Sequence, residues 1–458
     1  MRKYILLLIY MMGVGLAYGQ VVDPLDSIRK QFEKDVAKMR MEFEEYEAKA
    51  RADYFRYVES IKNVWGGDTV VDNSKRIWVE YDKDYRSRSI VDFEHGNVMV
   101  EVAVEDADMK DTLLVNRRLA EAVERMLKSR GSTCPYPSSV DVSEPLTEKP
   151  ILDGLIDLSV YGDEEVSNEM ADNAPRNVRP TPPQPTVRSK NLDLQRKQGQ
   201  EVVVMKTKHE KKSDGKTLAE KKKEGKEKAD QKSEKMKSDA DKYAIAKKVV
   251  AQSPKAITTT KGADGKERKV VQVQMSLVVD NLSRNAMLYK DLVSEFSVRF
   301  QIEEPLIYAI MEQESAFNPQ ATSWVPAYGL MQLVPRSGGR DAYRFVYKVD
   351  RIPEVSYLYN PRNNIELGTA YLRVLMNQFE RVTDPHCRRL CVIAGYNTGA
   401  GNVSRSFIGS TNLSKAFSSI CQFDYEGLYN HLVRNLPYEE TRNYVVKVTQ
   451  RREKYMKK

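Results

Sequence analysis

Residues 310 to 319 read Ile-Met-Glu-Gln-Glu-Ser-Ala-Phe-Asn-Pro, and after a short gap residues 328 to 332 read Tyr-Gly-Leu-Met-Gln. This pairing predicts a helix that carries an acidic residue into a loop and a glycine turn. Apolar residues recur at i, i+3 and i+4 from Ile307, which places Glu314 at i+7 on the same apolar stripe. Glu312 points about 160° away at roughly 100° per residue, so it is expected on the solvated side.

A carboxyl group on an apolar face has a chemical use. Loss of hydration disfavours the anion and raises the pKa, which is what a general acid needs near neutral pH. Protonation of a glycosidic oxygen is the natural reaction for such an acid. The alternative is a buried glutamate that a hydroxyl or a helix cap satisfies. The helix pattern alone leaves both interpretations of Glu314 open.

Four short motifs occur in an order that resembles a known family. In chain order they are Glu314-Ser315, Gly329-Leu330-Met331-Gln332, Tyr396-Asn397 followed by Gly399 and Gly401, and Glu440-Thr441-Arg442 with Tyr444. Their order and spacing resemble the soluble-lytic-transglycosylase-type domains, which share a goose-type lysozyme fold. The resemblance covers roughly residues 284 to 455.

The amino-terminal part resembles the membrane-bound lytic murein transglycosylase C group. The similar stretches are Trp65-Gly66, Trp78 to Glu101 with Tyr85-Arg86-Ser87-Arg88-Ser89 inside it, and Val270 to Val279. Members of this group usually have a cysteine at the processing site for lipid attachment. No cysteine lies near Gly19 or Gln20, so the resemblance does not extend to the lipid anchor.

The resemblance implies an enzyme of peptidoglycan glycan strands with Glu314 at the centre of its cleft. Glu314 would protonate the oxygen that links N-acetylmuramic acid to N-acetylglucosamine, and would then accept the proton of the muramoyl 6-hydroxyl as it attacks C1. The product is a 1,6-anhydromuramoyl end, and no water is consumed. Most glycosidases need two flanking carboxylates, whereas here the N-acetyl group of the substrate is taken to stabilise the charge at C1.

The resemblance also implies a set of substrate-binding residues around Glu314. They are Ser315, Gly329, Met331, Gln332, Tyr396, Asn397 and Tyr444. Each has an ordinary alternative: a serine that caps a helix, a turn glycine followed by core residues, or a buried tyrosine tied to backbone. No cofactor is implied, and no metal site is expected because the histidines lack ligand spacing with the cysteines.

The amino terminus has the composition of an export signal. Arg2 and Lys3 precede an apolar run from Tyr4 to Leu16, and Ala17-Tyr18-Gly19 supplies the small residues of a cleavage site. Residues 1–19 are therefore predicted to be a signal peptide, with a retained amino-terminal anchor as the alternative. The protein is expected in the periplasm or cell envelope, including association with the outer membrane.

The net charge of +8 and the pI near 8.9 are compatible with an acidic polymer as partner. Peptidoglycan carries carboxylates on its stem peptides, and nucleic acid is the other candidate. The export signal argues against nucleic acid, so glycan strands are the expected partner.

The chain is predicted to be an α+β multidomain protein with a C-terminal all-α lysozyme-like catalytic domain at 284–458. A long amphipathic helix that ends near Trp65 and a small α+β unit with alternating strands form residues 20–135. Residues 136–268 are proline-rich and then dominated by lysine and glutamate, which predicts a disordered or partly helical linker. Alternation within 269–283 predicts a strand that joins the amino-terminal sheet.

The four cysteines are Cys134, Cys387, Cys391 and Cys421. Cys387 and Cys391 lie four residues apart on a predicted helix, where parallel Cβ directions disfavour a bridge between them. A disulfide from one of these two to Cys421 and buried free thiols are both open.

Three functions remain from the sequence. The first is a lytic transglycosylase, and the second is a muramidase that uses the same acid with water as nucleophile. The third is a non-catalytic wall-binding scaffold. The intact Glu314-Ser315 pair argues against the scaffold, and a second carboxylate across the cleft would favour the muramidase.

Overall fold

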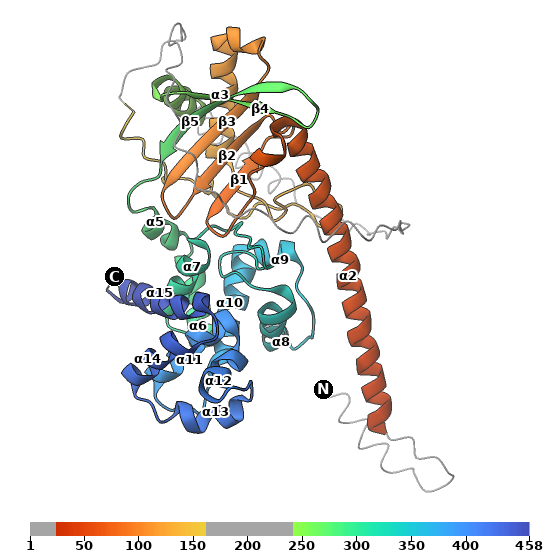
Figure 1. Cartoon of the computed structure of the whole chain (residues 1–458), viewed down its shortest axis with the longest axis vertical. Coiled ribbons are helices and arrows are strands. Elements are labelled where there is room, and N and C mark those ends of the chain that lie inside the picture. Colours follow the sequence, from red (N-terminus) through yellow and green to blue (C-terminus); the bar gives the residue numbers. More distant parts are fainter. Residues whose placement is uncertain (1–23, 162–240, 458) are drawn as a thin grey trace, which may run out of the picture.

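The computed structural model describes residues 24–161 and 241–457, which form a sheet unit and a helical unit (Figure 1). The predicted signal peptide and most of the predicted linker lie outside the described residues. The α+β class with a carboxy-terminal all-helical part is confirmed by the element order.

A five-stranded antiparallel sheet is the centre of the first unit. Its strands are β1 (Ile77–Tyr81), β2 (Ser87–Asp92), β3 (Asn97–Val104), β4 (Ala256–Lys261) and β5 (Glu267–Ser276). The spatial order is β1-β2-β3-β5-β4, with Val100 of β3 opposite Val273 of β5. The predicted strand after the linker is therefore present, and it pairs with the amino-terminal sheet because both strands present valines at alternate positions.

Helix α3 (Thr112–Lys128) buries its apolar stripe against this sheet. Asp111 caps its first turn by accepting a hydrogen bond from the backbone N–H of Leu114 at 2.9 Å. Leu119 and Val123 then pack on the sheet valines.

Both ends of the predicted linker at 136–268 prove to be part of the fold. Residues 151–156 place Ile151, Leu152, Leu155 and Ile156 in the sheet core, and a helix at 241–252 adds three more apolar residues to it. The linker boundaries from composition were therefore too wide. These short apolar clusters are diluted by polar neighbours in any longer window, so average composition hides them.

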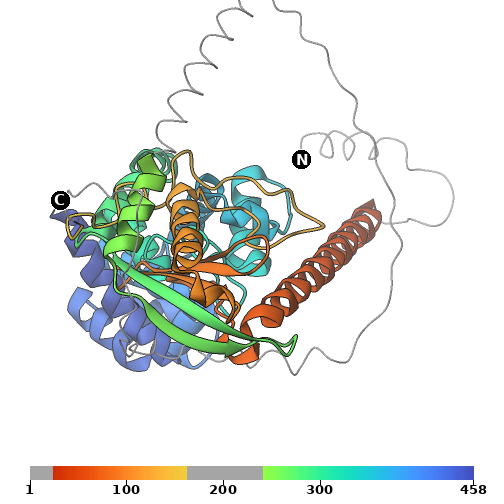
Figure 2. The ribbon, with the colours of Figure 1, turned by 90° about the horizontal axis from the view of Figure 1, so that it is seen from above.

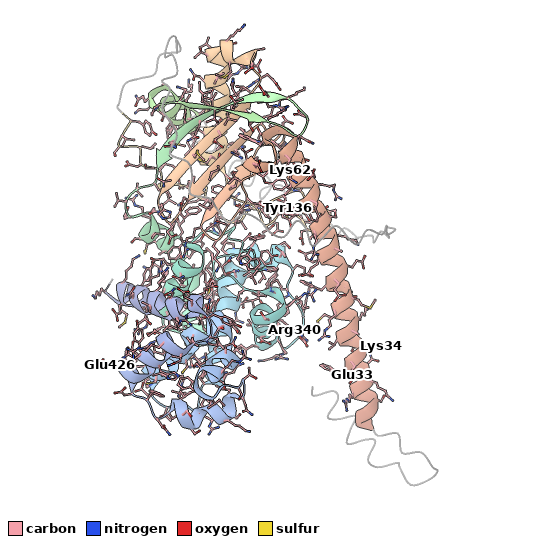
Figure 3. The ribbon with its side chains drawn as sticks, viewed as in Figure 1. Glu33, Lys34, Lys62, Tyr136, Arg340 and Glu426 are labelled. Atoms are coloured by element: carbon pink, nitrogen blue, oxygen red, sulfur yellow. The ribbon has the colours of Figure 1, made fainter. Side chains whose placement is uncertain are left out.

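The long helix α2 (Pro24–Trp65) is confirmed, and it ends in the core of the sheet unit. The indole N–H of Trp65 donates to the Tyr85 carbonyl at 2.5 Å. Farther back, Glu47 pairs with Arg336 of the helical unit at 2.8 Å. Glu33 and Lys34 lie on the exposed turns beyond, where α2 runs away from the rest of the protein (Figures 2 and 3).

The helical unit begins after β5 and continues to the carboxy terminus. Its helices are α5 (Asn281–Leu288), α6 (Lys290–Phe300), α7 (Glu304–Ser315), α8 (Arg340–Tyr347), α9 (Val355–Tyr359), α10 (Pro361–Gln378), α11 (Pro385–Thr398), α12 (Ala400–Ile408), α13 (Leu413–Ile420), α14 (Tyr425–Asn435) and α15 (Glu439–Met456). One apolar core joins them, with α7 packed along α15.

The four cysteines are free thiols in this structure. Cys387 and Cys391 are buried on α11, whereas Cys421 is exposed. Burial raises the pKa of the Cys387 thiol to about 11, so it stays protonated near neutral pH. The disulfide to Cys421 is not formed here, and the free-thiol alternative describes this state.

Candidate active site

Glu314 lies in the last turn of α7, and 5% of its surface is exposed. Glu304 and Pro305 begin this helix, because an acidic residue and a proline both suit a first helical turn. The helix ends at Ser315, and the next residue, Ala316, has a left-handed φ of 49°. The predicted position of Glu314 on the buried stripe is confirmed.

Glu312 is also buried, so its predicted place on the solvated side was wrong. Helix α15 covers that side of α7 and supplies Arg451, Lys454 and Tyr455 to its carboxylate. Burial alone would raise the pKa of Glu312, but the hydrogen bonds from Lys454 and Tyr455 outweigh it and the pKa is lowered. Glu312 is therefore a charged structural anchor between two helices.

The surroundings of Glu314 shift its pKa upward, opposite to the shift of Glu312. Burial raises the pKa of this carboxyl above its usual value, and the charge of the exposed Glu440 adds to the rise. Lys75 of the sheet unit and the hydroxyl of Tyr444 lower it, but burial prevails. The Lys75 ammonium lies 3.5 Å from Glu314 Oε2. A carboxyl group with a raised pKa next to a cation can act as both acid and base.

A tight turn at residues 328–333 lies beside the end of α7. Gly329 has φ 75°, and a Cβ atom there would lie 2.4 Å from Asn364 Nδ2 and 2.5 Å from the Leu358 carbonyl oxygen. The Asn364 side chain holds the turn because it accepts from the Met331 N–H and donates to the carbonyls of Tyr328 and Leu358. Only glycine fits position 329 without displacing this network.

Three of the predicted substrate-binding residues support the turn. The Ser315 hydroxyl donates to the Leu330 carbonyl at 2.8 Å, and Met331 is fully buried against Gly368. These contacts support a structural role for Ser315 and for the Met331 side chain in place of the expected contact with sugar. Gln332 donates to the carbonyls of Ala321 and Gly329, while its buried Oε1 has no hydrogen-bond partner among the described residues.

The other predicted residues come from α11 and α15. The Tyr396 hydroxyl donates to the Met331 carbonyl at 2.8 Å, and half-buried Asn397 accepts from the Thr441 hydroxyl at 2.7 Å. Tyr444 is buried close to Glu314, although its hydroxyl makes no hydrogen bond of regular geometry with the described residues. The structure thus brings Glu314, the glycine turn, Tyr396 and Tyr444 together from separate parts of the sequence.

Lys75, Asn364 and Thr441 complete this cluster, and the sequence did not assign them roles. Thr441 stood within a quoted motif, whereas no quoted motif includes Asn364 and no local pattern marks Lys75. Its contact with Glu314 depends on the packing of two units that are far apart in the sequence.

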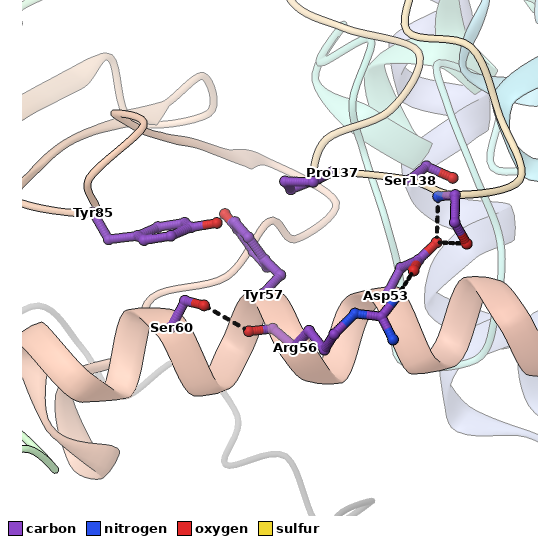
Figure 4. A pocket seen from close by; sticks show the side chains of 8 residues that line it. Asp53, Arg56, Tyr57, Ser60, Tyr85, Pro137 and Ser138 are labelled. Carbon is purple, nitrogen blue, oxygen red and sulfur yellow. Dashed lines mark hydrogen bonds and ion pairs between the residues drawn. The ribbon is translucent and has the colours of Figure 1, made fainter.

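A separate hollow of about 280 Å³ lies in the sheet unit. Its walls come from α2, Tyr85 and the segment 137–139, and the rings of Tyr57 and Tyr85 meet edge-on with their centroids 5.8 Å apart (Figure 4). Asp53 is tied to the backbone N–H and hydroxyl of Ser139 at one side. None of the predicted site residues lines it.

Two further properties hold for residues 24–161 and 241–457. No group of histidine, cysteine and acidic residues in these ranges has the arrangement of a metal site. No helix in these ranges is long and apolar enough to cross a membrane.

Two family matches cover different parts of the chain. Residues 291–416 match the transglycosylase SLT domain, and residues 20–117 match the membrane-bound lytic murein transglycosylase C, N-terminal domain. The first contains Glu314 and the glycine turn, and the second contains Lys75.

Curated relatives of this chain are named membrane-bound lytic murein transglycosylase C. The membrane-bound lytic murein transglycosylase C of Haemophilus ducreyi is 40% identical over 191 residues, which are 41% of this chain and 51% of that protein. The protein of the same name from Cronobacter sakazakii is 39% identical over 192 residues, or 42% and 52% of the two chains. The chain thus spans about half the length of the curated relatives it matches.

Solved structures of lytic transglycosylases are similar over a smaller share of their length. The lytic transglycosylase Slt from Pseudomonas aeruginosa is 27% identical, with a TM-score of 0.30 over 39% of this chain and 25% of that one. The 70 kDa soluble lytic transglycosylase Slt70 from Escherichia coli is 27% identical, with a TM-score of 0.28 over 36% and 24%.

Proposed function

We propose that this chain, which carries a transglycosylase SLT domain, is a peptidoglycan lytic transglycosylase that forms 1,6-anhydromuramoyl ends. The observation that carries the proposal is the buried carboxyl of Glu314 with its raised pKa, within the SLT match. Curated relatives named lytic murein transglycosylases support the same activity. The expected lyase class follows from the absence of water in the reaction.

One carboxyl group performs both proton transfers in the proposed mechanism. Protonated Glu314 gives its proton to the bridging oxygen, and the bond from that oxygen to C1 of N-acetylmuramic acid breaks. The Glu314 carboxylate then takes the proton of the muramoyl 6-hydroxyl while the oxygen of that hydroxyl bonds to C1. Glu314 ends protonated as it began, and the two glycan products account for every atom.

The residues around Glu314 have two kinds of role: some support the turn beside it, and others contact the substrate. Ser315, Gly329 and the Met331 side chain fix the turn beside Glu314, and Tyr396 binds the Met331 carbonyl. We assign substrate contact to Gln332 and Asn397, since the buried Oε1 of Gln332 has no partner among the described residues and Asn397 is half-exposed. Tyr444 lies close enough to Glu314 to orient its carboxyl.

The setting of the enzyme is also a proposal. Peptidoglycan is the partner, and nucleic acid is not. The predicted export signal and the names of the relatives support the periplasm or the cell envelope, with attachment to the outer membrane as one arrangement. We propose residues 284–458 as the catalytic domain and the sheet unit as its amino-terminal partner.

The test is a digestion of purified peptidoglycan by the exported protein and by its Glu314→Gln variant, with the released muropeptides identified by mass spectrometry. Anhydro ends from the wild type alone are expected. Reducing muramic acid ends would identify a muramidase. Wall binding without release by either protein would identify a scaffold.

A further inference from the structure

The catalytic candidate Glu314 has an ion-pair partner that comes from the other unit of the protein. Lys75 lies in the loop 70–76 that leads into β1, and its ammonium is 3.5 Å from Glu314 Oε2. The Lys75 side chain is 36% exposed, whereas that of Glu314 is 7% exposed. Lys75 thus reaches from a partly hydrated position toward a buried carboxyl group.

Both neighbours of Lys75 are fixed to the residues around Glu314. The Ser74 carbonyl accepts a hydrogen bond from Asn318 Nδ2 at 3.3 Å. On the other side, the Arg76 guanidinium donates to the Gln313 carbonyl at 2.9 Å. Gln313 directly precedes Glu314, and its carbonyl is at the end of α7, where a cation is favourable. The contact of Lys75 with Glu314 is therefore the centre of a docked loop.

The loop is also held within its own unit. The Asn73 side chain accepts from the Val79 N–H at 2.8 Å, and Arg76 pairs with Glu94 at 3.2 Å. These bonds tie the loop to β1 and to the turn after β2. The backbone on both sides of Lys75 is therefore fixed relative to Glu314. A flexible lysine that touched Glu314 by chance would not need such bonds.

We propose that Lys75 is a positioning residue of the active site, through which the amino-terminal unit holds the Glu314 carboxylate and stabilises the charge that the first proton transfer leaves on it. The inference rests on the proposed function, because it assigns Lys75 a part in that reaction. It also explains a physical need: an isolated carboxyl group in a buried site would hold its proton tightly and would be a poor proton donor. The family matches assign no such role to a residue of the amino-terminal unit.

Several groups face Glu314, and Lys75 is the cation among those that shift its pKa. Tyr444 and Glu440 approach from α15, and Tyr396 approaches from α11. Lys75 and Tyr444 lower the pKa of Glu314, whereas burial and Glu440 raise it. Removal of the Lys75 charge should therefore raise that pKa further, and replacement by arginine should not.

The first experiment measures kcat/KM for release of anhydromuropeptides against pH for the wild type, Lys75→Gln, Lys75→Arg and Lys149→Gln. Lys149 is exposed and is not among the groups that shift the pKa of Glu314, so its variant controls for the loss of one positive charge. We expect the basic limb of the profile to move up by about 1 pH unit in Lys75→Gln and to stay in place in the other two variants. A Lys75→Gln profile that superimposes on that of the wild type would overturn the proposal.

A second measurement needs no activity and covers a variant that is too slow to assay. The thermal stability of each protein is compared with that of its Glu314→Gln derivative over pH, which reports the titration of Glu314 in the folded state. The titration should lie at higher pH in the Lys75→Gln background than in the wild type, and equal titrations would overturn the proposal. If the wild type forms no anhydro ends, the proposed function fails while this coupling is still decided.

Discussion

The two sides of helix α7 hold carboxylates of the same residue type, both buried and two positions apart, with opposite shifts in pKa. Glu312 meets Arg451, Lys454 and Tyr455 of α15, and these partners keep it ionised. Glu314 meets one lysine, and burial prevails. Burial alone therefore does not produce an acid catalyst. The number of charged partners that the packing supplies determines which form of the carboxyl is stable.

The largest expected difference between the two sides is in rate. Glu314→Gln should lower the release of anhydromuropeptides by roughly 10³-fold, because the proton donor and acceptor is lost. Glu312→Gln should change the rate per folded molecule by about threefold or less, because its carboxylate faces α15. Initial rates with folded fractions from circular dichroism check both values. Equal losses would remove the functional distinction between the two carboxylates.

The turn on the Glu314 side should tolerate less change than an open turn elsewhere. Gly329→Ala should destabilise the protein by roughly 3 kcal/mol or more, because it adds a close contact with Asn364 and Leu358 to a positive φ. Gly409→Ala is the matched control, since Gly409 has φ 70° and open space around the added Cβ. It should cost about 1 kcal/mol. Denaturant unfolding measures both, and similar costs would contradict the tight fit.

The pH dependence of stability should have opposite signs for the two carboxylates. The pKa of Glu312 is lowered in the fold from a reference value of 4.5, so its contribution is present above that value and lost as pH falls through the folded pKa. The pKa of Glu314 is raised, so its contribution is present below 4.5 and lost as pH rises through the folded pKa.

Thermal melts of the wild type, Glu312→Gln and Glu314→Gln from pH 3 to 8 would measure these contributions, taking about 3 and 8 as the ends of the useful range. The amount by which the wild type is more stable than Glu312→Gln should shrink toward low pH. The amount by which it is more stable than Glu314→Gln should shrink toward high pH. Parallel curves would mean that the two environments do not differ.

The smallest expected effects come from two tyrosines of α15. Tyr444→Phe should move the basic limb of the activity profile upward by about half a pH unit, because the hydroxyl lowers the pKa of Glu314. Tyr455→Phe should leave the profile unchanged and cost about 1 to 2 kcal/mol of stability, because its hydroxyl donates to Glu312. A shift of the profile in Tyr455→Phe would contradict the separation of the two sides.

The local periodicity of apolar residues was sufficient to predict these helices and strands and the burial of Glu314. The helix from Glu304, the long helix to Trp65 and the alternating strands all follow from spacing within one segment. Glu312 was misplaced because its partners lie on α15, and the period of a helix does not reveal which of its sides a distant helix will cover.

The same limit applies to the residues around the site. The motifs identified Ser315 and Met331, but their contacts with Leu330 and Gly368 are those of structural supports, which spacing cannot distinguish from contacts with sugar. Lys75 had no local signal, because its role arises only when two units dock. The core residues at 151–156 were hidden among polar neighbours for a related reason.

Because β5 returns to pair with β3 along eight residue pairs, a proteolytic cut anywhere from 162 to 240 would divide the chain without dividing the protein. The two fragments would still share one sheet and its core, and they should co-purify as a nicked complex. The segments on either side of residues 162–240 thus belong to one folded unit, since both pack in the same core. The distance between Lys75 and Glu314 therefore depends on contacts that residues outside that segment make with one another.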